Sequence, residues 1–498
     1  MHADAAYLFR HVLVRDAAYQ LQVPGDRARL HAMAVDILDA ETRAQPELIS
    51  IRADECSQHC AAAAAGFEDT ELAKRFRLRE LDSALIAAEY FDKSHRLGDA
   101  ARVYVVIANH PNRSPAQSSR ALARLCKICV LIGPADEALR YADRLELEAQ
   151  DIDAQVEVFL TRSSMSALRN ESAGALLALQ TALDLPGLIL GSPAWIKIQC
   201  RRAMYLVRQH GIPEALSIME ETRLAAHESG DAQLRAQWLN MHARVLAVSG
   251  RLAESEAGYR EALGVFEQLG DKVSAVVSRG DLASVVSDLH RDDDSEQLFL
   301  CAIEEARQVG DSYNELVHSH NYAVSMANQQ RDDEALSLYR KIEATARERG
   351  FPKIAVHAAV GLAKRHINKG LSSVAADILL RNLGLPMDHE EGERGDYLHH
   401  LVLALDQSGR RSEIVSLADD VRDAKFPPGA RYEFHRYFAC AITATALQES
   451  GQGKRAQELA QVAWEEAKRL NIAQRFKGNQ RNRALGEICR ILGIDEPA

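Results

Sequence analysis

Apolar residues recur through most of this chain three or four positions apart, which is the spacing of amphipathic helices. In the stretch from Leu316 to Gly350 the pattern predicts a first helix to Gln329, a polar turn "QQRDD", and a second helix that Gly350 ends. We expect Asp332 or Asp333 to cap that second helix. Its apolar stripe consists of Ala335, Leu338, Tyr339 and Ile342. Few segments alternate with a period of two, so the pattern predicts an all-α protein.

The helical pairs repeat. Gly-Asp occurs at 230–231, 270–271 and 310–311, a spacing of 40 residues. Two further series keep this spacing: a small residue at Ala203, Ala243, Ala283, Ala323 and Ala363, and a large one at Met219, Tyr259, Phe299, Tyr339 and Leu379. A small side chain in the first helix lets the bulky side chain of the second helix pack beside it. The series therefore predict stacked helical hairpins.

The segment "HNYAVSMANQQRDDEALSLYRKI" resembles a tetratricopeptide repeat (TPR), with Ala323, Ala335, Tyr339 and Ile342 at that family's spacing. The period is longer than the family's, and its early tryptophan and turn proline are mostly missing. The resemblance implies a right-handed superhelical solenoid of TPR-like hairpins in units of about 40 residues. We assign residues 46–495 to this array.

The opening stretch, "LFRHVLVRDAAYQLQVPGDRARLH", has a different pattern. It predicts a helix through Tyr19, a turn at Pro24, and a second helix capped by Asp26. The stretch resembles the distal end of the winged-helix segment in signal-transduction ATPases with numerous domains, the STAND class. The matching positions are Phe9, Arg10, His11, Leu13, Arg15, Asp16, Tyr19, Arg27, Leu30 and His31. By this resemblance, residues 1–45 are the remnant of an ATPase-distal segment, and His11 would contact the phosphates of a nucleotide if an intact ATPase module were present.

Motifs for catalysis are missing from the sequence. No G-x-x-x-x-G-K-[ST] run occurs, and "GQGKRA" at 451–456 lacks the glycine spacing and the hydroxyl that a phosphate loop needs. The 18 histidines have no motif context. We therefore expect no enzyme activity and no cofactor.

Metal binding has two sequence candidates, "CSQHC" at 56–60 and the C-x-x-C of Cys126 and Cys129. Both lie within helical patterns, where cysteine is a small buried residue, so no metal is expected. Eight scattered cysteines fit free thiols in a reducing compartment, and neither a signal peptide nor a long apolar run is visible. These features predict a cytoplasmic protein that does not bind membranes, and the resemblance to STAND-class arrays implies a bacterial source.

The net charge of −11 argues against nucleic acid as a partner. The basic segment 468–483 could contact nucleic acid or an acidic partner, although a solvated capping helix is the simpler interpretation.

Stacked hairpins place their first helices on a concave side, where extended partners bind. Counting from each small alanine gives the expected partner-binding residues: Lys197, Arg201, Gln237, Asn240, Arg244, Asp281, His320, Asn321, His357, Lys364 and His400. Most are polar or cationic, which would favour an acidic or carboxylate-bearing protein or peptide. A small effector is a further possibility, and a groove that is merely solvated is the simplest alternative.

Two functions remain open. The first is a non-catalytic binding array, the sensor and scaffold region of a bacterial STAND-type signalling regulator that lacks its ATPase module here. The second is a stand-alone TPR adaptor that binds peptide or protein partners. The opening stretch favours the first.

Overall fold

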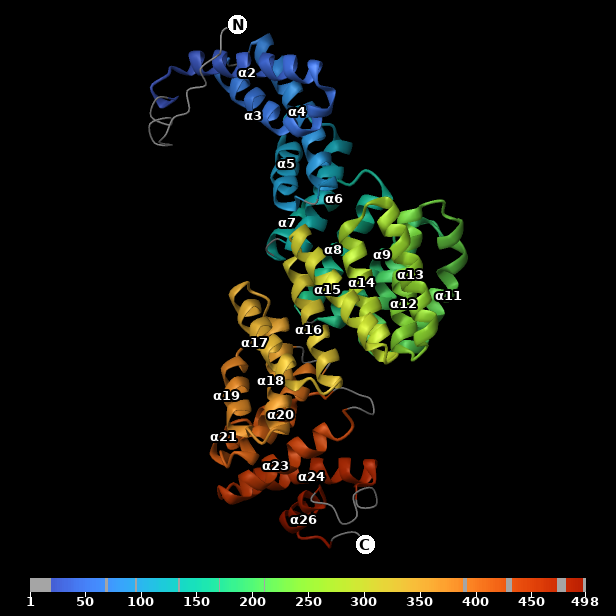
Figure 1. Ribbon diagram of the computed structural model, residues 1–498, viewed down its shortest axis with the longest axis vertical. Helices are drawn as coiled ribbons and strands as arrows, with labels where there is room; N and C mark the ends of the chain where they lie inside the picture. Colours follow the sequence, from blue (N-terminus) through green and yellow to red (C-terminus); the bar gives the residue numbers. More distant parts are fainter. Residues whose placement is uncertain are drawn as a thin grey trace. The chain divides into compact units, whose positions relative to one another are not determined.

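The structure is a computed structural model that describes residues 19–67, 70–94, 96–132, 135–169, 171–209, 211–387, 392–426, 432–472 and 481–495. These residues form helices joined by short turns, and no strand occurs among them (Figure 1). The chain divides into two compact units, residues 1–166 with 177–188, and residues 167–176 with 189–498. We call them unit 1 and unit 2. Because the described residues form successive packed helices without strands, the predicted all-α repeat class is confirmed.

The first helix of unit 1 that is described in full, α2 (Pro24–Ala44), includes part of the opening stretch. The helices of unit 1 are α2, η1 (Pro46–Leu48), α3 (Ile49–Gly66), α4 (Glu71–Lys93), α5 (Leu97–Asn109), α6 (Pro115–Ile132), α7 (Ala135–Glu148) and α8 (Ile152–Leu168), and α9 (Ser172–Leu183) is shared with unit 2. Val23 is the N-cap of α2, and Asp26 lies in its first turn, so the predicted cap at Asp26 is wrong.

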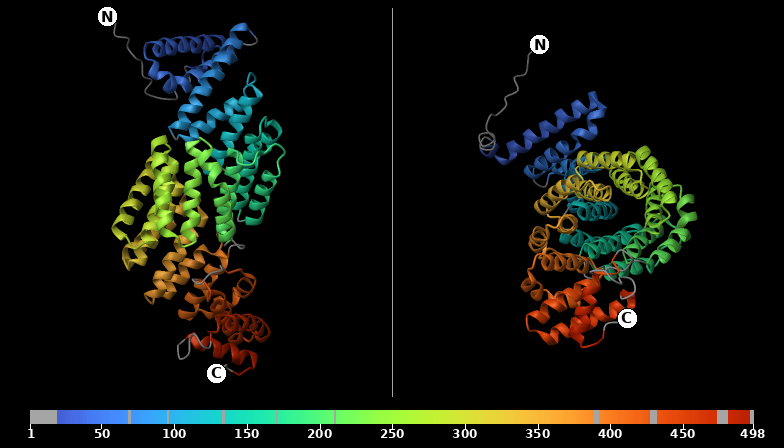
Figure 2. Two further views of the ribbon diagram at one scale, coloured as in Figure 1. Left: turned by 90° about the vertical axis from the view of Figure 1, so that its right-hand side faces the viewer. Right: turned by 60° about the horizontal axis from the view of Figure 1, so that its bottom comes forward.

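Unit 2 consists of successive helical hairpins, which lie side by side in Figure 2. The first helices are α10 (Pro193–Arg208), α12 (Ala232–Val248), α14 (Lys272–Asp288), α16 (Ser312–Asn328), α18 (Pro352–Asn368), α20 (Glu393–Gln407) and α23 (His435–Glu449). The second helices are α11 (Ile212–Glu228), α13 (Leu252–Leu269), α15 (Asp292–Val309), α17 (Asp332–Glu348), α19 (Ser372–Asn382), the pair α21 (Arg411–Ser416) and α22 (Ala418–Asp423), and α24 (Gly453–Leu470). The last helix described is α26 (Arg481–Leu492).

The Gly-Asp pairs form the junctions between hairpins. Gly270 is the left-handed C-cap of α13, with φ of 70°, and Asp271 is the N-cap of α14, accepting a hydrogen bond from the Ser274 amide at 3.0 Å. The junction at 310–311 is built in the same way. At 230–231 the C-cap of α11 is Ser229, and Gly230 follows it with a left-handed φ of 69° before Asp231 caps α12. Glycine adopts this backbone conformation without the strain that a Cβ would cause.

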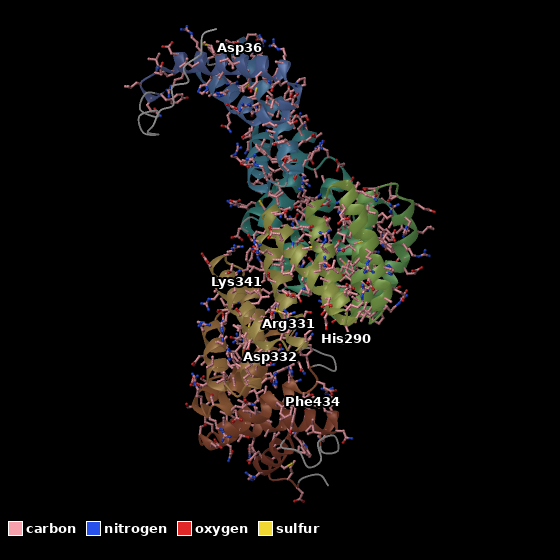
Figure 3. All side chains as sticks on the ribbon, viewed as in Figure 1. Asp36, His290, Arg331, Asp332, Lys341 and Phe434 are labelled. Carbon is pink, nitrogen blue, oxygen red and sulfur yellow. The ribbon has the colours of Figure 1, made fainter. Side chains whose placement is uncertain are left out.

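The turn before α17 differs from the prediction. Arg331, and neither Asp332 nor Asp333, is the N-cap of α17, and no side chain caps that helix (Figure 3). The Arg331 guanidinium donates to Glu334 in the first turn and to Glu296 one repeat earlier. Arg291 bonds Asp294 and Glu256 in the same way. Arginine pairs therefore fasten these turns to the preceding hairpin.

The small and large series pack as predicted. All five alanines of the first helices are fully buried, and each large residue of the second helices is at most 3% exposed. In two units a serine of the second helix lies next to the alanine of the first helix. Ser255 Oγ donates to the Ala243 carbonyl at 2.7 Å, and Ser295 Oγ donates to the Ala283 carbonyl at 3.0 Å. A hydroxyl at this position thus bonds one helix of the pair to the other.

Successive first helices of unit 2 contact one another from α10 to α20, whereas among the described residues no comparable contact joins α11, α13, α15 and α17. The first helices are therefore closer together, and this stretch curves with its first helices on the concave side. Within the described residues, no helix is both long and apolar enough to cross a membrane.

Candidate functional site

The first helices of unit 2, which line its concave surface, carry the predicted partner-binding residues. We call this surface, formed by α10, α12, α14, α16, α18 and α20, the first-helix face. The helices place these residues as follows: Lys197 and Arg201 on α10, Gln237, Asn240 and Arg244 on α12, Asp281 on α14, His320 and Asn321 on α16, His357 and Lys364 on α18, and His400 on α20. His11 lies outside the described residues.

Arg244 and Asp281 form an ion pair between α12 and α14, with Nη2 and Oδ2 2.5 Å apart. The attraction of Asp281 raises the pKa of Arg244, with a further contribution from the Tyr259 hydroxyl. Both side chains are about two-thirds or more buried. Arg244 therefore remains charged and is held by its own fold, so a ligand would have to compete with Asp281 for it.

Uncharged side chains connect the same helices. Ser278 Oγ donates to Asn240 Oδ1 at 2.8 Å, which joins α14 to α12. The Ser287 and Ser325 hydroxyls are 2.7 Å apart and join α14 to α16. Residues one repeat apart are thus bonded along the first-helix face, and part of its polarity is structural.

His320 and His357 continue the series from α16 to α18. Their ring centroids are 5.8 Å apart, and His320 also contacts Tyr339 edge to face. Burial lowers the pKa of His320 to about 4, and the neighbouring His357 lowers it further. His320 is therefore neutral at pH 7. His357 is half exposed, and its Nε2 lies 2.6 Å from Glu393 Oε1.

A histidine that the sequence analysis missed lies behind this face. His318 is 1% exposed, and neither of its ring nitrogens has a hydrogen-bond partner. It packs against Gly280, where a Cβ atom would lie 2.1 Å from the ring. Burial lowers the pKa of His318 and keeps it neutral. The spacing from 280 to 318, close to one repeat, was the only sequence signal for this contact.

The far end of the face gathers histidines around one carboxylate. Asp396 Oδ2 is 3.8 Å from Lys364 Nζ, and its Oδ1 is 3.5 Å from His400 Nδ1 and 2.9 Å from His435 Nδ1. His399 completes the group, with its ring stacked on His435 at 4.0 Å. We call His399, His400 and His435 the histidine cluster. Of these three, the sequence analysis named only His400. His399 is its buried neighbour on α20, and His435 belongs to the next hairpin.

Lys197, Arg201 and Gln237 differ from the rest of the set. Among the residues that the structure describes, neither cation has a carboxylate partner, and the Gln237 amide forms no hydrogen bond. Gln237 is exposed, and the two cations are partly exposed. The end of the face at α10 and α12 therefore offers hydrogen-bond donors and positive charge that the fold itself does not use.

The cysteine motifs are buried in helices, as their patterns indicated. Cys56 and Cys60 lie inside α3, and Cys126 and Cys129 inside α6. His59 turns away to a contact of 2.7 Å between its Nδ1 and that of His31. In the described part of the chain, the one group of three residues placed to hold a metal ion is instead the histidine cluster.

No protein-family model matches this chain, and no curated protein matches it in sequence. Among solved structures, a STAND protein with a tetratricopeptide repeat sensor from Pyrococcus horikoshii is similar over 91% of this chain and 68% of that chain, with 10% identity and a TM-score of 0.46. Aspartyl phosphate phosphatase F from Bacillus subtilis is similar over 72% of this chain and 93% of its own, with 11% identity and a TM-score of 0.41. A tetratricopeptide repeat protein from Parabacteroides merdae is similar over 58% and 99%, with 14% identity and a TM-score of 0.37. At these TM-scores the similarities say nothing about function.

Proposed function

We propose that the chain is a non-catalytic repeat array that binds a peptide or protein segment along the first-helix face. The proposal rests on one observation: the cations of this face differ in whether a carboxylate of the fold pairs with them. Arg244 and Lys364 are paired with carboxylates of the fold, whereas no carboxylate in the part of the chain that the structure describes pairs with Lys197 or Arg201. Unpaired cations on a concave surface favour a carboxylate-bearing ligand, because charge-assisted hydrogen bonds to it are stronger than neutral ones. We place the anchor of the ligand on α10 and α12.

The test is a peptide-display selection on the immobilised chain, with the double variant Lys197→Ala/Arg201→Ala as the comparison. We expect the selected peptides to be acidic and to lose at least about tenfold in affinity to the double variant, since each ionic hydrogen bond contributes about 1.5–3 kcal/mol. The loss should shrink at high salt, because screening already weakens these contacts in the parent chain. Fluorescence polarisation of labelled peptides measures both effects.

The matched control is Lys341→Ala. Lys341 is an exposed lysine on the second helix α17 (Figure 3), so its removal takes one positive charge from the surface, as each substitution of the double variant does, but leaves the first-helix face intact. Affinity should stay within about twofold of the parent, and thermal melts of all variants should coincide within about 0.5 kcal/mol. Selected peptides that bind the double variant as tightly as the parent chain would move the site elsewhere.

Within this function, we propose the role of sensor and scaffold in a STAND-type regulator. Its support is the motif from Phe9 to His31, most of which precedes the described residues. A stand-alone adaptor is the alternative. Sequencing the reading frame upstream of Met1 separates them: codons for a Walker-type ATPase would support the regulator, and a stop codon in that frame would support the adaptor.

A further inference from the structure

The histidine cluster joins two first helices that are separated in sequence by α21 and α22. His399 and His400 lie on α20, and His435 is the first residue of α23, directly after the labelled Phe434 in Figure 3. One ring nitrogen of each histidine lies within 4.8 Å of the others. Asp396 precedes His399 by three residues and His400 by four, so it shares their face of the helix. The helical geometry therefore brings three histidines into a position to hold a metal ion, with the Asp396 carboxylate beside two of them.

Several of these atoms form no well-aligned hydrogen bond within the fold. His399 is 7% exposed, and its Nδ1 has no hydrogen-bond partner. His435 Nδ1 and Asp396 Oδ1 contact each other at 2.9 Å as an ion pair, without the alignment of a hydrogen bond. Buried polar atoms without good hydrogen bonds are costly, and a bound metal ion would satisfy those that converge here.

His400 is already oriented as a metal ligand. Its Nδ1 lies 2.8 Å from the backbone carbonyl of Asp396, to which it donates, and this leaves the Nε2 lone pair free. Metal-bound histidines are commonly fixed in this way through the ring nitrogen that does not bind the ion. Asp396 divides its carboxylate similarly, since Oδ2 faces Lys364 and Oδ1 faces the histidines.

We propose that His399, His400, His435 and Asp396 bind one divalent transition-metal ion, Zn²⁺ by their chemistry, and that this ion fastens α20 to α23. Three imidazoles and one carboxylate form an ordinary tetrahedral zinc set. Bonds of 2.0–2.1 Å place tetrahedral ligands about 3.3 Å apart, so the side chains move inward by about 1 Å on binding. The parallel rings of His399 and His435 have to separate, because a ring binds an ion in its own plane.

The experiment uses the full chain without a histidine tag, stripped with a chelator and titrated with ZnCl₂ in a calorimeter. We expect one equivalent to bind with a dissociation constant of about 1 μM or lower, and the melting temperature to rise with zinc. Co²⁺ should give the visible absorption of a tetrahedral nitrogen and oxygen site. A near-ultraviolet thiolate band would place the ion on cysteine and overturn the proposal.

Variants locate the site. His399→Ala, His435→Gln and Asp396→Asn should each weaken zinc binding at least about tenfold and abolish the zinc-dependent rise in melting temperature. His290→Asn changes an exposed histidine outside the cluster and should bind zinc like the parent chain. If His399→Ala fails to fold, as judged by circular dichroism without metal, the two isosteric changes decide the outcome. Zinc binding that is absent from the parent chain, or unchanged in His435→Gln and Asp396→Asn, would refute the site.

Discussion

At the scale of single residues, glycines inside the helices of unit 2 make room for rings from the neighbouring helix. A Cβ on Gly280 would lie 2.1 Å from the His318 ring, and one on Gly361 would lie 2.7 Å from the Tyr339 ring. Glycine weakens a helix by about 0.5–1 kcal/mol relative to alanine. The cost is offset where a large ring fills the space, and such positions are not recognisable from helix propensity alone.

A comparison of Gly280→Ala with the control Gly264→Ala tests this packing. Gly264 lies inside α13 with open space around its Cβ position, so alanine there should stabilise the chain by about 0.5–1 kcal/mol. Gly280→Ala should instead destabilise it by about 1–3 kcal/mol through overpacking against His318. Urea denaturation measures both. The double change Gly280→Ala/His318→Ala should show non-additive effects, and equal stability of the two single glycine variants would contradict the packing.

At the scale of helices, the sequence predicted the Gly-Asp junctions, which depend on local chemistry. It predicted the wrong N-cap for α17, because the start of that helix depends on the neighbouring hairpin. Gly270 and Asp271 end one helix and cap the next within two residues, so a pattern in the sequence suffices. The start of α17 is set instead by Arg331, which reaches Glu296 across 35 residues. The histidine cluster escaped prediction for the same reason, because its members come from two hairpins.

The caps can be tested by Asp231→Ala. The Asp231 carboxylate accepts from the Leu234 amide at 3.1 Å, and losing this bond should cost about 1 kcal/mol. Asp293→Ala is the control, since Asp293 is exposed in the first turn of α15 without being its cap. Its loss should cost only a few tenths of a kcal/mol, from the helix dipole alone. Thermal melts compare the two, and equal losses would show that the cap contributes nothing of its own.

At the scale of the whole chain, almost every helix contact joins elements one or two places apart along the sequence. The 40-residue period made this order predictable, because each unit buries its apolar face only against its neighbours. The first-helix face was predictable in outline from the same period, and its role in binding stays a prediction. Which of its charges are already neutralised was not, since Arg244–Asp281 and Lys364–Asp396 each depend on the distance between two hairpins.

Because each repeat contacts only its neighbours, a destabilising substitution should lower the stability of nearby helices only. Ala323 is fully buried in α16, a helix that contacts α14, α15, α17 and α18. Ala323→Leu should overpack this contact and cost about 1–3 kcal/mol. In a repeat array the loss weakens one unit and its interfaces, so amide hydrogen exchange should accelerate in α14–α18 and stay unchanged in α3 and α4. Val324→Leu, at a partly exposed neighbouring position, is the control for added bulk and should leave exchange close to that of the parent. Exchange that accelerated equally in α3 and α16 would mean that the chain unfolds as one cooperative unit, and an Ala323→Leu variant without any change would mean that the small series does not set the helix spacing.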